Sequence, residues 1–296
     1  MPFLNSVLRW LARRPLSWVQ MAGAAVGWLS WALSPTYRRR VAQNAGLAGL
    51  QPSQRRAAVR EAGRMSFEVP WLWFREAGRP LAGLIAWDGA ELVDAALAQG
   101  RGLLLLTPHL GAFEFAARGY AERYGARQPI TVLYRPSKHA LLAEMQTFSR
   151  TAPGMQAAPA NLAGVRQMLR ALRRGESVGL LPDQVPPAGQ GVWAPFHGQP
   201  AYTMTLAARL VQQTGCAVLL TWCERLPGGS GFRLHYRPLP QALPERGDEA
   251  SAALINQAME WTIAQCPTQY LWGYNRYKAP RAAEPAAAGS TPGSAA

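Results

Sequence analysis

From about residue 84 onward, short apolar runs alternate with longer segments of helical periodicity. The run RGLLLLT (101–107) is bounded by Gly and Pro, which is typical of a buried strand, and GAFEFAARGYAERYG (111–125) follows it as a helix. Further strands are expected at 130–136, 177–183, 216–226 and 231–239, and further helices at 138–150, 162–175, 203–215 and 248–266. This alternation predicts an α/β fold, with a mixed, mostly parallel sheet flanked by helices.

The N-terminal segment Leu16–Leu33 contains no charged residue and is flanked by arginines on both sides. Its 18 residues would span roughly 27 Å as a helix, which is just enough for a bilayer core. A buried core helix is the alternative. A membrane anchor, either spanning or half-inserted, is favoured because Gly, Ala and Trp occur on all faces. We therefore predict an anchor helix with basic flanks over 1–40, the main domain over 41–280 and a disordered tail over 281–296.

Positive charge is concentrated near the N-terminus. The chain carries a formal net charge of +14, and residues 1–80 contain 12 Arg against three Glu, together with six of the 11 Trp residues. Arg with Trp indicates an anionic membrane surface, since Trp rings settle at the lipid headgroups. No nucleic-acid-binding motif is present, so we expect no nucleic-acid partner.

The cysteine and histidine contents limit the chemistry further. Three cysteines without a CxxC pattern exclude a disulfide framework and indicate a reducing compartment. Apart from one histidine discussed next, His139, His197 and His235 show no metal-ligand spacing, so no metal site is predicted.

His109 and Glu114 are a titratable pair in otherwise apolar sequence. On one continuous helix, residues five apart point roughly 140° away from each other. Pro108, however, ends the strand and leaves His109 in a turn, so that Glu114 in the first turn of the next helix can reach back to it. A carboxylate that orients an imidazole prepares the other ring nitrogen to take a proton from a substrate hydroxyl. A structural histidine is the alternative.

The sequence GESVG (175–179) matches the G-x-S-x-G motif of serine hydrolases. That motif requires a strand, a sharp turn and then a helix. Here a helix precedes the motif and a strand follows it, so Ser177 is not expected to be a nucleophile.

Four further polar residues are expected at the carboxyl edge of the sheet, where α/β folds bind ligands. Arg135 ends a strand and Arg150 ends a helix. Asp183 follows a strand and begins a long loop rich in Pro and Gly, and Arg276 lies in the aromatic segment PTQYLWGYNRYKAP. Taken singly, they could be a surface Arg, a helix-capping Asp and part of a satisfied C-terminal cluster. Together with His109 and Glu114 they give one edge that carries a base, its acidic partner, cations and a carboxylate, and we expect these four residues to bind the substrate.

The ordered set of motifs resembles the late lipid A (lauroyl/myristoyl) acyltransferases, within the lysophospholipid acyltransferase superfamily. The resemblance covers roughly residues 5–280 and rests on the H-x4-E pair His109–Glu114, YRP (134–136), Arg150, LPDQ (181–184) and QYLWGYNRYK (269–278).

The resemblance implies a glycerolipid acyltransferase-like fold and an enzyme at the bacterial inner membrane whose catalytic domain faces the cytoplasm. His109 would be the general base, oriented by Glu114, and the hydroxyl of a lipid A precursor would attack the thioester of an acyl carrier protein. Arg150 would contact a phosphate or the oxyanion, and Asp183 would be a structural or polar-contact residue. No cofactor is implied.

Two other functions stay open at this stage. One is acyl transfer to another phosphate-bearing lipid, such as a lysophospholipid or a mannosylated phosphoinositide. The other is a non-catalytic protein that binds anionic lipid through its basic N-terminal region.

Overall fold

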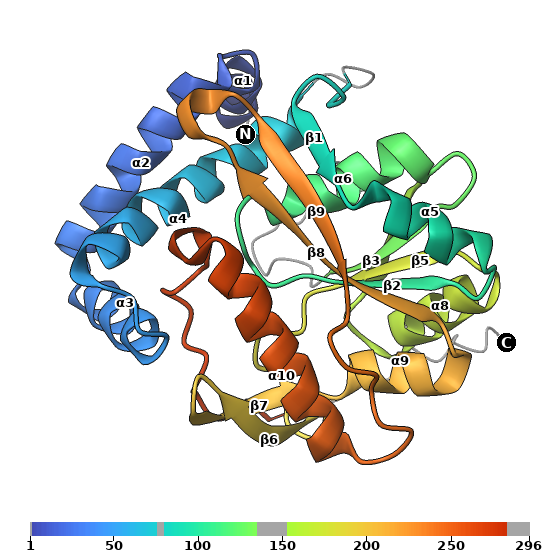
Figure 1. Cartoon of the computed structure of the whole chain (residues 1–296). Coiled ribbons are helices and arrows are strands. Elements are labelled where there is room, and N and C mark those ends of the chain that lie inside the picture. The colour runs from blue at the N-terminus through green and yellow to red at the C-terminus, as the bar shows by residue number, and fades with distance from the viewer. Residues whose placement is uncertain (1, 76–79, 135–152, 283–296) are drawn as a thin grey trace, which may run out of the picture.

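A computed structural model describes residues 2–75, 80–134 and 153–282 of the chain (Figure 1). The helices are α1 (Pro2–Ala12), α2 (Leu16–Leu33), α3 (Pro35–Leu47), α4 (Pro52–Trp73), α5 (Ala90–Ala98), α6 (Phe113–Tyr124), α8 (Leu162–Arg173), α9 (Leu206–Thr214) and α10 (Asp248–Gln265). The strands are β1 (Ile85–Asp88), β2 (Leu103–Leu106), β3 (Ile130–Tyr134), β4 (Met155–Pro159), β5 (Ser177–Leu180), β6 (Gly191–Phe196), β7 (Gln199–Met204), β8 (Ala217–Arg225) and β9 (Phe232–Pro238). The expected helix at 138–150 lies outside the described residues.

A seven-stranded sheet with the order β1-β9-β8-β2-β5-β3-β4 forms the centre of the molecule. All neighbouring strands are parallel except β8 and β9, which pair as an antiparallel hairpin. This confirms the predicted mixed, mostly parallel sheet. Strands β2 and β5 are neighbours, so the segments that leave their carboxyl ends lie close together.

The four leucines of β2 are buried because both faces of the sheet are covered. Leu104 and Leu106 belong to a core cluster that includes residues of α8 and α10, whereas Leu103 and Leu105 belong to a second cluster with residues of α5 and α6. Successive side chains of a strand point to opposite faces. An uninterrupted apolar run is therefore what a central strand of this sheet requires.

The segment after β5 differs from the expected long loop. Residues 191–204 form the antiparallel hairpin β6–β7, which packs against α10. His197 and Gly198 form its two-residue turn, with φ of 45° and 72°. Pro195 pairs with Pro200 in this two-stranded sheet, so the strands tolerate prolines that a central strand would not.

Helix α2 packs along α4 through a row of glycines. A Cβ atom at Gly23 would lie 2.6 Å from the carbonyl oxygen of Gly63, and one at Gly27 would collide with that of Val59. The two backbones are therefore closer than side chains would allow. This contact buries one face of α2 and leaves a second apolar face exposed, which includes Trp18, Met21, Leu29 and Leu33.

The anchor predicted at 1–40 is not confirmed as a membrane-spanning element. Among the described helices, none is long and apolar enough to cross a membrane. Figure 1 shows α1, α2 and α4 side by side, next to the turn of the β8–β9 hairpin.

Candidate active site

His109 lies in the turn between β2 and α6, as its sequence context predicts. The turn is held by backbone hydrogen bonds: Leu271 donates to the carbonyl of His109 (3.1 Å), and Gly111 donates to that of Gln269 (3.0 Å). Gly111 has a φ of 61°, and a Cβ at this position would collide with the carbonyl oxygen of Cys223. Backbone contacts with the neighbouring segments therefore fix the position of His109.

Asp183 holds the imidazole of His109 in one orientation. Its Oδ1 lies 2.7 Å from Nδ1 of His109, and its Oδ2 accepts the backbone N–H of the same residue at 2.9 Å. Because an ionised carboxylate can only accept, the proton of a neutral imidazole is on Nδ1 and its lone pair is on Nε2. This is the tautomer that a general base needs.

The Asp183 carboxylate is almost completely buried. Burial alone would raise its pKa, but the charge of His109 and the hydrogen bonds from its ring and backbone, with a further contribution from Arg276, bring that pKa below the ordinary value. Asp183 is therefore held in its ionised form beside the imidazole.

Gln184 occupies the other ring nitrogen. Its amide nitrogen lies 3.1 Å from Nε2 of His109, at the distance of a hydrogen bond donated to the lone pair. Consecutive residues after β5 thus contact both nitrogens of one imidazole. Asp183 was a predicted site residue, but neither its direct bond to His109 nor the contact of Gln184 was predicted.

Glu114 lies in the first turn of α6 and lines the same cavity as His109. The carboxylate on Nδ1 of His109 belongs to Asp183, however, so the predicted orientation of His109 by Glu114 stays a prediction. The ring of Phe113, next to Glu114, lies 4.9 Å from the imidazole, centre to centre.

Arg276 occupies a different place from the one expected of a substrate-binding residue. It is 2% exposed, and its guanidinium donates to the carbonyl of Tyr202 (2.7 Å) and the hydroxyl of Thr203 (2.8 Å). It therefore supports the β6–β7 hairpin from inside rather than facing the cavity. Arg135 and Arg150, the other two predicted cations, lie outside the described residues.

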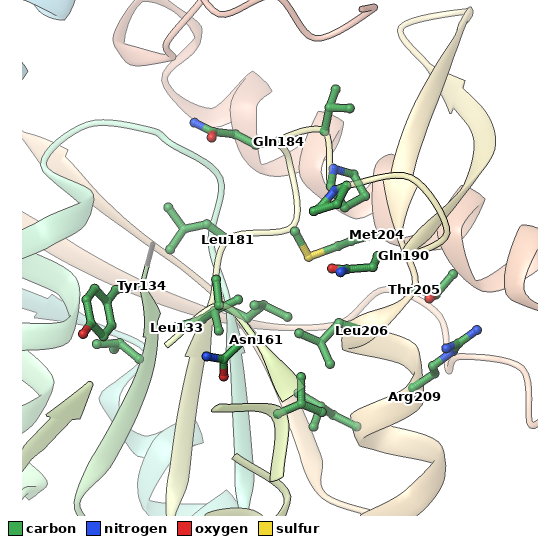
Figure 2. A pocket seen from close by; sticks show the side chains of 18 of the residues that line it. Leu133, Tyr134, Asn161, Leu181, Gln184, Gln190, Met204, Thr205, Leu206 and Arg209 are labelled. Carbon is green, nitrogen blue, oxygen red and sulfur yellow. The ribbon is translucent and has the colours of Figure 1, made fainter. Parts of the chain in front are cut away.

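A cavity of about 820 Å³ extends from His109 across the carboxyl ends of β3 and β5, between α8 and α9. Figure 2 shows Leu133, Leu181, Met204 and Leu206 around it. Its apolar lining also includes Val132, Met155, Val165, Leu169, Leu180 and Leu210, and its polar lining includes Asn161, Gln184, Gln190, Thr205 and Arg209. The cavity is therefore suited to a long apolar group with a reactive end at His109.

Ser177 and the three cysteines are not placed for nucleophilic chemistry. Ser177 begins β5, is fully buried and shares a 2.6 Å hydrogen bond with the hydroxyl of Tyr120. The thiols of Cys216, Cys223 and Cys266 are buried, and burial raises their pKa values, that of Cys266 to about 12. Within the described residues, no three His, Cys, Asp or Glu side chains are grouped to hold a metal ion.

Residues 3–279 match the family model described as bacterial lipid A biosynthesis acyltransferase. The chain is 29% identical over 218 residues to the lipid A biosynthesis lauroyltransferase of Escherichia coli K12, which is 73% of this chain and 68% of the relative. It is 28% identical over 214 residues to the palmitoleoyltransferase of the same organism (71% and 66%). It is also 28% identical over 205 residues to the phosphatidylinositol mannoside acyltransferase of Mycobacterium tuberculosis (68% and 61%).

Proposed function

The chain belongs to the bacterial lipid A biosynthesis acyltransferase family, and we propose that it transfers a fatty acyl chain from a thioester to a hydroxyl of a lipid A precursor. The observation that carries this proposal is the position of His109. His109 lines a cavity with a largely apolar wall, and its Nδ1 is fixed by a buried carboxylate, which leaves Nε2 as the basic nitrogen. That arrangement joins a base for a hydroxyl to a compartment for a hydrocarbon chain.

The proposed reaction needs no nucleophile from the enzyme. Nε2 of His109 takes the proton of the acceptor hydroxyl as the oxygen attacks the thioester carbonyl carbon. The C–S bond then breaks, and the proton on His109 passes to the leaving thiolate, so an ester and a free thiol are the products. Asp183 stabilises the imidazolium that exists between the two proton transfers. Glu114, at the same cavity, is proposed to share in orienting His109 once substrate is bound.

We propose an acyl carrier protein as the donor and the inner membrane as the site of action, with the catalytic domain on the cytoplasmic side. An acceptor with hydrocarbon chains stays in a bilayer, so the enzyme must reach the membrane surface. The exposed apolar face of α2 supports this placement, because a contiguous apolar surface of this kind marks an interaction site. Since α4 covers the opposite face of α2, we propose that α2 lies in the plane of the membrane surface, with Trp18 at headgroup level.

A matched pair of variants tests the membrane contact. Trp18 and Trp193 are both exposed, at 60% and 50%, but Trp193 lies on the β6–β7 hairpin. In flotation assays with anionic vesicles, Trp18→Gln should weaken binding by about tenfold, and Trp193→Gln should leave it unchanged. Equal binding by both variants and the unaltered protein would contradict the proposed orientation of α2.

A second candidate exists for the lipid that accepts the acyl chain. A relative in Mycobacterium tuberculosis is named for acylation of phosphatidylinositol mannoside, a lipid with a phosphate and sugar hydroxyls. A phosphate-bearing lipid other than a lipid A precursor is therefore the alternative acceptor, with the same use of His109.

Mass spectrometry of lipid A decides between these acceptors. Cells without the gene would be complemented with the wild-type protein, with His109→Ala or with Ser177→Ala. We expect the wild-type and Ser177→Ala proteins to add one acyl chain to lipid A and His109→Ala to add none. Unchanged lipid A in all strains, with an altered phospholipid profile, would support the alternative acceptor. Activity of His109→Ala would exclude its role as the base, and membrane binding without any acylation would indicate a non-catalytic lipid-binding protein.

A further inference from the structure

Helix α8 carries a basic stripe along its exposed side. Arg166, Arg170 and Arg173 follow one another at spacings of four and three residues, so they project from the same face of the helix. All three are exposed, and α8 contains no acidic residue. The helix buries its other side through Gly164, Met168, Ala171 and Leu172.

This positive charge is not neutralised within the described part of the chain. Arg174, just after the helix, forms a two-fold hydrogen bond with Glu176, and Arg209 on α9 pairs with Asp248. For the three stripe arginines, the described residues provide no carboxylate partner. The stripe is thus available to an acidic partner.

The stripe flanks the wall of the catalytic cavity. Val165 and Leu169 line that cavity and each directly precedes a stripe arginine, about 100° around the helix. Leu162, at the start of α8, lines the cavity as well and is still 65% exposed, which places it at the mouth. A partner seated on Leu162 and the arginines would therefore sit beside an entrance that leads to His109.

We propose that the α8 face, formed by Leu162, Arg166, Arg170 and Arg173, is the docking surface for an acidic carrier protein that delivers the acyl chain as its thioester. The inference rests on the proposed function, since it names the surface that receives the proposed donor. An apolar residue bordered by cations suits an acidic protein partner, and opposite charge accelerates association. Steering by the stripe would bring the thioester arm to the cavity mouth.

A soluble protein fits this face better than a bilayer does. The α8 face has one exposed large apolar residue, whereas α2 has Trp18, Met21, Val26, Leu29 and Leu33. Figure 1 shows α2 and α8 on opposite sides of the molecule. A carrier protein could therefore occupy α8 while α2 contacts the membrane.

Charge reversal with a matched control tests the docking surface. Arg166→Glu/Arg170→Glu is compared with Arg233→Glu/Arg246→Glu, in which two exposed arginines of β9 and the loop before α10 undergo the same change of charge. Each protein is assayed with an acyl carrier protein thioester and with the same chain on N-acetylcysteamine, a small uncharged thiol. Thermal unfolding and vesicle binding are measured in parallel.

For the stripe variant we expect the KM for the carrier thioester to rise at least about tenfold, with less than twofold change for the small donor. For the wild-type enzyme, the KM for the carrier thioester should increase with salt, because salt screens the attraction between the arginines and the acidic carrier. For the stripe variant it should increase much less, because the charges that salt would screen are gone. The control variant should behave like the wild type with both donors.

Four results would overturn the docking surface. An unchanged KM for the carrier thioester, or an equal rise in the control variant, would show that α8 has no specific role. Loss of vesicle binding by the stripe variant would assign α8 to lipid instead of protein. A wild-type enzyme that uses the small donor but no carrier thioester would overturn the proposed donor and the docking surface together, whereas the first three results leave the donor in place.

Discussion

Asp183 and His109, 74 residues apart in the chain, are joined by two hydrogen bonds, one to the imidazole and one to the backbone of His109. The bond from the His109 backbone N–H to Oδ2 fixes the position of the carboxylate. The bond between Oδ1 and Nδ1 fixes the orientation of the imidazole ring. Because both oxygens of one carboxylate are used, the ring cannot rotate without breaking a buried charge-assisted bond. The orientation of Nε2 toward the cavity is therefore set by a strand-to-strand relationship between β2 and β5.

Replacement of Asp183 by Asn should abolish most activity while the shape of the site is kept. The Asn carbonyl can still accept the backbone N–H of His109, but its amide would then face Nδ1 and donate to it. The neutral ring would carry its proton on Nε2, where it cannot act as a base. We expect kcat to fall at least about 100-fold in a transfer assay. An Asn variant with near wild-type kcat would show that the tautomer does not matter.

The ionised Asp183 also predicts a pH dependence of stability. Its pKa is lower in the folded protein than in the unfolded chain, so the carboxylate stabilises the fold above the ordinary Asp range and loses that effect as pH falls through the folded value. Below about pH 5, the free energy of unfolding of the wild type should fall more steeply with acidification than that of Asp183→Asn. Chemical denaturation at a series of pH values measures both slopes. Parallel slopes would contradict the assignment.

Gln184 should compete with the acceptor for His109. Its amide occupies Nε2, the atom that the acceptor hydroxyl has to approach. A typical hydrogen bond contributes about 0.5–1.5 kcal/mol, so Gln184→Ala should lower the KM for the acceptor by about two- to tenfold and change kcat less than tenfold. Steady-state kinetics with varied acceptor separate these effects. A 100-fold loss of kcat would instead make the amide part of the catalytic machinery.

The sequence predicts the strand, turn and helix around His109 because they depend only on residues that are neighbours in the chain. Four leucines, a proline and a helix start within 11 residues specify strand, turn and helix, and the structure has all three. The contact of Asp183 with Nδ1 of His109 depends on β2 lying next to β5. No sequence pattern within either segment predicts which strands are neighbours. Glu114 is the partner that the local sequence suggests, and its part in orienting His109 stays a prediction. Asp183 is the carboxylate that the order of the strands brings to Nδ1.

Two other features of the structure also depend on contacts that are distant in sequence. The apolar composition of α2 is the same whether lipid or protein surrounds it, so the glycine contact with α4 becomes visible only in three dimensions. Arg276 was placed at the site because its segment is rich in aromatic residues and cations. The hairpin β6–β7, hidden in a stretch with many Pro and Gly residues, is what buries it.

The glycine contact between α2 and α4 predicts a steric effect. A Cβ at Gly63 would collide with the carbonyl oxygen of Gly23, a backbone atom that cannot move aside as a flexible side chain can. Gly63→Ala should therefore destabilise the protein by about 1–3 kcal/mol, although Ala is the better helix former. Gly83→Ala is the control, since a Cβ there meets nothing within 4 Å. Thermal unfolding of the two variants in the same detergent measures the difference, and equal melting temperatures would contradict close packing of these helices.

A buried ion pair between Arg225 and Glu68 joins the end of β8 to α4, and its contribution to stability can be predicted. The Arg225 guanidinium donates to both carboxylate oxygens of Glu68 (2.5 Å each) and to Glu61 (2.6 Å), and Gln20 of α2 also donates to Glu68 (2.8 Å). Burial alone would lower the pKa of Arg225, but the two glutamates outweigh it and raise that pKa, so the arginine stays charged.

Removal of one partner leaves the other charge buried without compensation, which typically costs about 3–5 kcal/mol. We expect Glu68→Gln to destabilise the protein by an amount in that range, as measured by chemical denaturation. Glu68→Leu combined with Arg225→Met should be less destabilised than either single replacement, because apolar side chains of similar size need no partner. If the double variant is instead as unstable as the sum of the single variants, the two residues act independently, and the ion pair is not what holds α4 to β8.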